Sequence, residues 1–135
     1  MNPLRSLTDW LSSFFRPRTL GERGEAVAAR YLRRHGYRIV GRGVRTSMGE
    51  LDLVAVDGRT VVFVEVKTRQ TDQQGHPAEA VDLAKQRKLT LLATSYLKRH
   101  RLLNHAARFD VVAVTWPDGR RPKVEHIRNA FEAVE

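Results

Sequence analysis

Apolar and polar residues alternate over two neighbouring segments, Glu50–Val56 and Thr60–Lys67. A period of two is typical of a β-strand, and the Asp57-Gly58 pair between the segments favours a tight turn because glycine tolerates a positive φ. The pattern therefore predicts a β-hairpin. Away from its acidic residues the hairpin is apolar on both faces, one of which should carry both Leu51 and Leu53. We therefore expect it in the middle of a sheet that is covered on both sides.

Helical periodicity surrounds this hairpin in the sequence. One helix is predicted from about Leu20 to His35, closed by Gly36, and a second from Pro77 to about Arg99. Further strands are predicted at 37–45, 108–115 and 123–127, followed by a helical turn at 130–134. The element order α-β-β-β-α-β-β predicts an α/β fold with a mixed central β-sheet flanked by helices.

The first 18 residues differ in pattern from the remainder. Apolar side chains recur at helical spacing there, but Asp9 and several serines interrupt them, and Arg-Pro-Arg ends the segment. We interpret 1–18 as an amphipathic or flexible extension and 19–135 as a single domain. An interaction protein that acts on a membrane or a partner through Met1–Arg18 is one functional class that this pattern leaves open.

The charge of the chain restricts its partners. The 135 residues carry 24 lysines and arginines against 15 acidic residues, a net charge of +9. Such a balance favours a polyanion such as nucleic acid. The chain has no cysteine, which excludes disulfides and thiolate zinc sites and agrees with a cytoplasmic location. It has no apolar run of the length that spans a membrane.

The hairpin register decides which charged residues lie together. If the loop is only Asp57-Gly58, Val56 pairs with Arg59, and alternate residues outward from that pair share a face. Four charged side chains then project to one side of the hairpin at its open end, namely Glu50, Asp52, Glu65 and Lys67.

This grouping indicates a metal site. Strand interiors are poor in acidic residues, and like charges on adjacent strands destabilise the pairing. A divalent cation, Mg²⁺ or Mn²⁺, would resolve the conflict, with Asp52 and Glu65 as the bridging ligands. Lys67 would lie close enough to contact an attacking water or a developing negative charge.

Other candidates come from the two predicted helices. Glu25 lies on the inward face of the first helix, where its charge would need a partner. Alternatively, it lies near the start of the helix and complements the helix dipole from solvent. Glu22 is the second candidate for the helix glutamate of the site. On the second helix the apolar stripe continues into Lys85 and Gln86, which either reach the site or form an ordinary solvated turn. The predicted nucleic-acid contacts are Arg42, Arg45, Arg69, Lys85 and Arg87.

Two sets of motifs resemble known families. The spacing Asp-x12-Glu-x-Lys from Asp52 to Lys67 resembles the PD-(D/E)xK motif of restriction-endonuclease-like nucleases, although Leu51 replaces the usual proline. More broadly, GERGEAVAARYLRRHGYRIV, GELDLV, VVFVEVKTR, KQRKL and RFDVVAV resemble the YraN family of small bacterial proteins, over about Gly21–Val114. That resemblance implies a restriction-endonuclease-like core, related by fold to archaeal Holliday junction resolvases, and it places the family's helix glutamate at Glu25.

Together these observations predict a metal-dependent nuclease that hydrolyses phosphodiester bonds in DNA, with branched or structured DNA suggested by the resemblance. Asp52, Glu65 and Glu25 would hold the metal, and Lys67 and Gln86 would assist the reaction. The alternative is a non-catalytic nucleic-acid-binding module on the same fold. A homodimer would resemble the junction resolvases.

Overall fold

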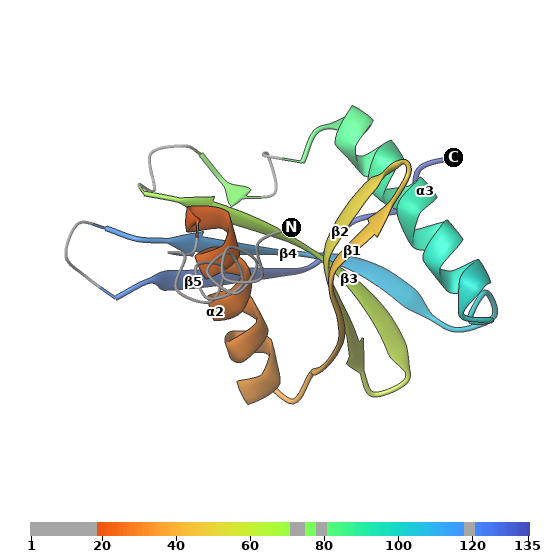
Figure 1. Cartoon of the computed structure of the whole chain (residues 1–135), viewed down its shortest axis with the longest axis horizontal. Helices are drawn as coiled ribbons and strands as arrows, with labels where there is room; N and C mark the ends of the chain where they lie inside the picture. The colour runs from red at the N-terminus through yellow and green to blue at the C-terminus, as the bar shows by residue number, and fades with distance from the viewer. Residues whose placement is uncertain (1–18, 71–74, 78–80, 118–120) are drawn as a thin grey trace, which may run out of the picture.

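The computed structural model of the chain describes residues 19–70, 75–77, 81–117 and 121–135. In chain order its elements are α2 (Leu20–Arg34), β1 (Arg38–Thr46), β2 (Gly49–Asp57), β3 (Thr60–Arg69), α3 (Leu83–Arg99), β4 (Ala107–Thr115) and β5 (Lys123–Phe131) (Figure 1). The predicted α/β class and element order are confirmed. The predicted extension at 1–18 lies outside the described residues. Neither α2 nor α3 is long and apolar enough to cross a membrane.

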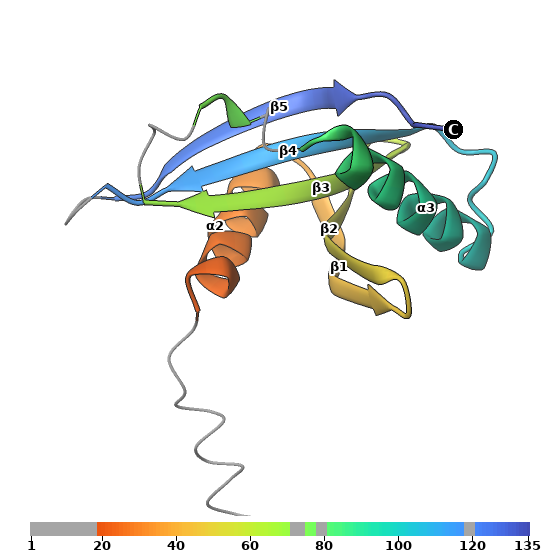
Figure 2. The same cartoon turned by 90° about the horizontal axis from the view of Figure 1, so that it is seen from above.

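The five strands form one mixed sheet in the order β1-β2-β3-β4-β5. Neighbouring strands are antiparallel except β3 and β4, which are parallel. Parallel neighbours cannot be joined by a tight turn, and the segment that contains α3 provides the required crossover (Figure 2).

Two hydrophobic cores cover the two faces of the sheet. On β3, Val62 and Val64 belong to the core that contains Leu32 of α2. Their neighbour Phe63 belongs to the second core, which contains Leu92 of α3. Alternate side chains of one strand therefore pack under different helices, as expected for a central strand covered on both sides.

The β2–β3 hairpin has a different register from the predicted one. Asp57 pairs with Thr60, so the loop is Gly58-Arg59 and not Asp57-Gly58. Gly58 has a φ of +62°, which suits the first position of a two-residue turn. Asp57 stays in the strand, where its carboxylate accepts a hydrogen bond of 3.1 Å from Arg108. The two-residue shift preserves the faces, because side chains alternate with a period of two.

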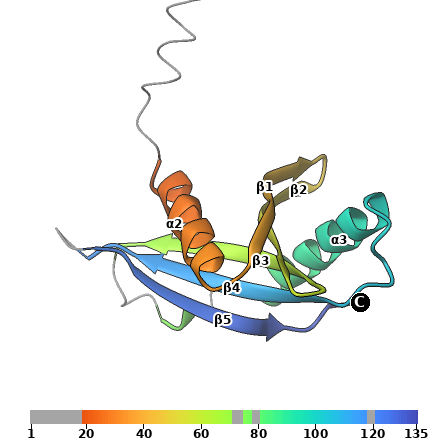
Figure 3. The same cartoon turned by 90° about the horizontal axis from the view of Figure 1, so that it is seen from below.

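Strand β2 leaves β3 near the middle of the sheet. Their pairing ends at Leu53 and Val64, and the β1–β2 hairpin then projects alone between the two helices (Figure 3). The prediction that Leu51 shares a face with Leu53 is wrong: Leu51 packs in the core under α3. Beyond the last pair, the Val66 N–H donates to Asp52 Oδ2 at 2.9 Å, so a side chain replaces the missing strand partner. We call this opening the β2–β3 split.

Two predicted element boundaries are also wrong. Helix α3 begins at Leu83 and not at Pro77, because Asp82 is its N-cap and accepts a hydrogen bond of 2.8 Å from the Lys85 N–H. Strand β5 continues through the start of the predicted helical turn at 130–134. Its last residue, Phe131, pairs with Phe109 on β4, and the two rings stack with centroids 4.6 Å apart.

Asp110 on β4 is a structural ion-pair residue. It is fully buried and accepts hydrogen bonds from Arg108 Nε at 3.0 Å and from the Asn129 N–H at 3.0 Å. His126 Nε2 lies 2.7 Å from its other oxygen. Burial raises the pKa of Asp110, but the hydrogen bonds from His126, Arg108 and Asn129 outweigh burial and hold the pKa below its usual value. This network fastens β5 to β4.

Candidate functional site

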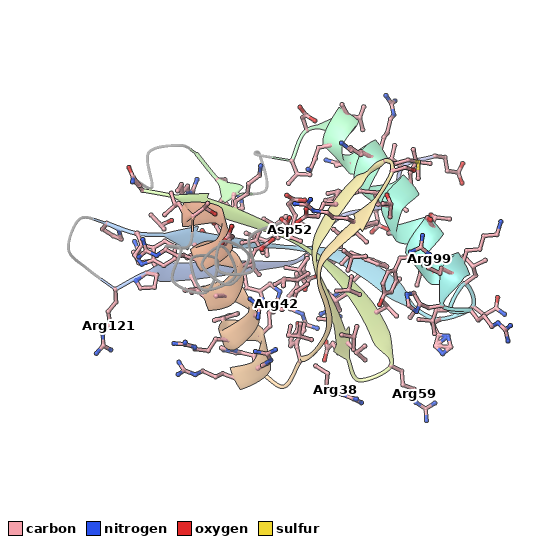
Figure 4. The ribbon with its side chains drawn as sticks, viewed as in Figure 1. Arg38, Arg42, Asp52, Arg59, Arg99 and Arg121 are labelled. Atoms are coloured by element: carbon pink, nitrogen blue, oxygen red, sulfur yellow. The ribbon has the colours of Figure 1, made fainter. Side chains whose placement is uncertain are left out.

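Carboxylates from a helix and a strand converge at the β2–β3 split. One oxygen from each of Glu25 on α2 and Glu50 and Asp52 on β2 lies within 4.8 Å of the others, and all three residues are half-buried. Figure 4 shows Asp52 in the region between α2 and the β1–β2 hairpin. We call these three residues together with Glu65 the acidic cluster.

Close helix–sheet packing places Glu25 in this cluster. The preceding residue, Gly24, is buried against β3, and a Cβ atom there would lie 1.8 Å from Thr68 Oγ1. Only glycine allows this approach, so α2 lies close enough to β3 for Glu25 to reach the split. The inward position predicted for Glu25 therefore agrees with the structure. Glu22 is exposed in the first turn of α2 and contributes no oxygen to the group.

Glu65 on β3 lies deepest in the acidic cluster. It is only 7% exposed and shares a hydrogen bond with Asp52. Burial and then the negative charge of Asp52 raise the pKa of Glu65 to about 7. Burial, followed by the charges of Asp52 and Glu50, also raises the pKa of Glu25. The carboxylates therefore destabilise one another in their charged forms.

Basic side chains from three elements surround the acidic cluster. Lys85 Nζ on α3 lies 3.8 Å from Glu65 Oε2, so the polar end of the α3 stripe reaches the cluster. The positive charge of half-buried Lys67 also acts on Glu65. On β1, the charge of Arg42 favours ionised Glu25, and Arg45 Nε lies 3.0 Å from Glu50 Oε2.

Three residues predicted for the site have different surroundings. Gln86 donates from Nε2 to the Val81 carbonyl at 3.0 Å, which fixes it to the chain before α3. Arg69 donates to Gly75 O at 2.7 Å. Arg87 is exposed on α3. Within the described ranges, no hydrogen bond or ion pair joins Gln86, Arg69 or Arg87 to the acidic cluster.

Glu50 is the residue whose role the sequence prediction missed. The predicted metal ligands were Glu25, Asp52 and Glu65, whereas the three oxygens that lie close together come from Glu25, Glu50 and Asp52. The available signal was the position of Glu50 two residues before Asp52 on the same strand. In the structure Glu50 also pairs with Arg45, whose Nε lies 3.0 Å from Glu50 Oε2.

The donor set suits a hard divalent cation. All four cluster side chains offer carboxylate oxygens, the ligand type that Mg²⁺ and Mn²⁺ prefer. A dication at Asp52 would also oppose the repulsion that raises the pKa values of Glu25 and Glu65. The residues present therefore fit the metal that the sequence suggested.

Comparison with known proteins identifies relatives over most of the chain. A UPF0102 protein of Geobacter sulfurreducens is 51% identical over 113 residues, covering 84% of this chain and 88% of the relative. A UPF0102 protein of Geobacter metallireducens is 48% identical over 115 residues, covering 85% and 93%. One from Rhodococcus jostii is 48% identical over 112 residues, covering 83% and 95%.

The family profile described as "Uncharacterised protein family UPF0102" matches residues 24–114, which include the four acidic residues of the cluster. The match confirms the family resemblance drawn from the sequence motifs. The chain therefore belongs to the uncharacterised protein family UPF0102.

Proposed function

We propose that this protein is a metal-dependent nuclease that hydrolyses phosphodiester bonds, with DNA as its preferred substrate. The observation that carries the proposal is the acidic cluster at the β2–β3 split, in a chain whose net charge is +9. A protein that only bound nucleic acid would gain nothing from four carboxylates beside its phosphate-binding surface, because they repel phosphate. A metal-dependent hydrolase needs such a group.

The side chains divide into ligands and cationic groups. Asp52 and Glu65 would hold Mg²⁺ or Mn²⁺ together with Glu25 and Glu50. The bound ion would lower the pKa of a coordinated water and offset negative charge on the scissile phosphate. Lys67, two residues after Glu65 on β3, would stabilise charge on the reacting phosphate.

Lys85 has a separate role in this proposal. Its ammonium group lies 3.8 Å from the buried Glu65 carboxylate and favours the ionised form that a metal ligand must have. Arg42 and Arg45 extend from β1 beside the cluster and would contact phosphates on either side of the cut. The resemblance to junction resolvases suggests that branched DNA is the substrate.

A cleavage assay with a matched pair of variants tests the proposal. Labelled four-way junctions, flaps, duplexes and single strands are incubated with the protein in Mg²⁺, Mn²⁺ or EDTA. We expect metal-dependent cleavage that Glu25→Gln abolishes and Glu22→Gln retains, because the two glutamates lie on the same helix but only Glu25 joins the cluster.

Calorimetric titration with Mn²⁺ distinguishes the nuclease from a non-catalytic nucleic-acid-binding module. Metal binding that is lost in Asp52→Asn supports the proposed centre. Nucleic-acid binding without metal binding or cleavage would contradict it and would favour the non-catalytic binding module.

A further inference from the structure

A basic hollow lies on the flank of α2 that faces away from the acidic cluster. It has a volume of about 500 Å³ and is formed by the outer side of α2 and the chain entering β5. Relative to Glu25, Arg30 and Arg34 are rotated by about 140° and 180° around the helix axis at 3.6 residues per turn. Figure 4 shows Arg121 and Asp52 on opposite sides of α2. The hollow is therefore separate from the acidic cluster.

Three arginines provide the charge of this hollow. Arg30 and Arg34 come from α2 and Arg121 from the residues before β5, and no acidic residue is among the lining side chains. Across the described part of the chain, none of the three has a hydrogen bond or ion pair from its side chain. Three arginines that line one hollow without a counter-charge favour an anion, and their planar guanidinium groups suit phosphate oxygens.

The wall between the arginines is aromatic. Tyr31 and His35 stack with ring centroids 4.1 Å apart, and Tyr31 also meets His126 edge-on at 5.8 Å. His35 is further fixed by a contact of 2.8 Å between Nδ1 and the Tyr31 carbonyl. Val27, Pro122 and Val124 supply apolar surface beside the rings. A lone phosphate ion would leave this surface unused, whereas a nucleotide has a phosphate for the arginines and a flat base for the rings.

We propose that this hollow binds a single-stranded segment of nucleic acid, with a phosphodiester on Arg30, Arg34 and Arg121 and a base against Tyr31 and His35. The accessible faces of the bases are what separate a single strand from a duplex, in which the bases are stacked on one another. The inference deepens the proposed function by adding a single-stranded part to the substrate. It rests on the proposed function in one respect only, namely that the polyanion is a nucleic acid.

Binding of a labelled 12-residue oligothymidylate in EDTA tests the phosphate contacts without cleavage. Arg34→Ala and Arg121→Ala should each weaken binding roughly tenfold. Each should also flatten the slope of log affinity against log salt by about 0.7 for each phosphate that the protein no longer neutralises. Arg33→Ala is the matched control, since Arg33 is exposed on the same helix but does not line the hollow. Equally weakened binding in Arg33→Ala and Arg34→Ala would overturn the proposal.

An abasic oligonucleotide of the same length tests the stacking contact. The abasic oligonucleotide has the same phosphates but no bases. If a base stacks on the Tyr31 ring, the wild-type protein should bind the abasic oligonucleotide about 5- to 150-fold more weakly than oligothymidylate. Tyr31→Leu, which keeps an apolar side chain, should bind the two oligonucleotides equally. Equal binding of the two oligonucleotides by the wild-type protein would refute a nucleotide site. So would competition in which polyglutamate displaces the labelled oligothymidylate as well as unlabelled oligothymidylate does. If Glu25→Gln abolishes cleavage but still binds the oligonucleotides as the wild-type protein does, the hollow binds nucleic acid independently of the acidic cluster.

Discussion

Replacing Glu65 by glutamine should remove a pH-dependent loss of stability from the metal-free protein. Glu65 is buried beside Asp52, and its pKa of about 7 exceeds the ordinary value of 4.5. Between these pH values the folded protein retains a proton that the unfolded chain releases. The free energy of unfolding must therefore fall as the pH rises from about 4.5 to about 7. Glutamine cannot ionise, but its amide can still donate a hydrogen bond to Asp52.

The size of the effect follows from the two pKa values. Their difference corresponds to about 3 kcal/mol, a large share of the roughly 5–15 kcal/mol that stabilises a typical domain. Wild-type protein in EDTA should lose about this amount between pH 5 and pH 8 relative to Glu65→Gln. Glu25, whose pKa is also raised, contributes in the same direction to both proteins and cancels in the comparison.

Urea unfolding followed by circular dichroism at pH 5, 6, 7 and 8 measures the difference. Glu132→Gln, a change at an exposed carboxylate on the chain after β5, is the control and should follow the wild-type curve. Added Mg²⁺ should restore the stability of the wild-type protein at pH 8 but not that of Glu65→Gln. A constant difference between the two proteins from pH 5 to pH 8 would refute the conclusion that Glu65 holds a proton in the folded state.

Three further changes test other parts of the structure. Gly24→Ala should cost about 1–3 kcal/mol in urea unfolding, because its Cβ would collide with Thr68, and Thr68→Ala should recover part of this loss. Asp110→Ala should cost about 3–5 kcal/mol, since half-buried Arg108 loses one of its two carboxylate partners and His126 and the Asn129 N–H lose this buried acceptor; an unchanged urea midpoint would contradict this. Lys67→Arg should retain DNA affinity but slow single-turnover cleavage by about 10²–10³-fold, and near-wild-type turnover would reduce Lys67 to a background charge.

The faces of the strands could be predicted because they depend on a period of two. The hairpin loop is shifted from Asp57-Gly58 to Gly58-Arg59, yet an even shift keeps the paired residues Ala55 and Val62 on the face assigned to them. The inward side of α2 was predictable for the same kind of reason. Helical periodicity alone places Glu25 with the buried residues Ala28 and Leu32.

Features that depend on contacts between distant residues could not be read from the pattern. The loss of pairing between β2 and β3 before Leu53 requires the Asp52 side chain to accept the hydrogen bond of the Val66 N–H, a contact between residues 14 positions apart. The late start of α3 depends on Asp82, whose capping geometry competes with the proline signal at Pro77. The length of β5 depends on aromatic stacking with Phe109 on the neighbouring strand.

The β2–β3 split gives the second half of β3 a free edge, although β3 is the central strand of the sheet. From Glu65 onward its backbone pairs with β4 on one side only, and the Val66 N–H on the other side is bonded to a carboxylate. Unpaired strand edges invite the addition of a foreign strand, and charged side chains at the edge are one way in which proteins prevent it. A strand that entered here would have to bury Asp52 and Glu25 without compensation. The same carboxylates that suit a cation therefore also protect the protein from edge-to-edge association.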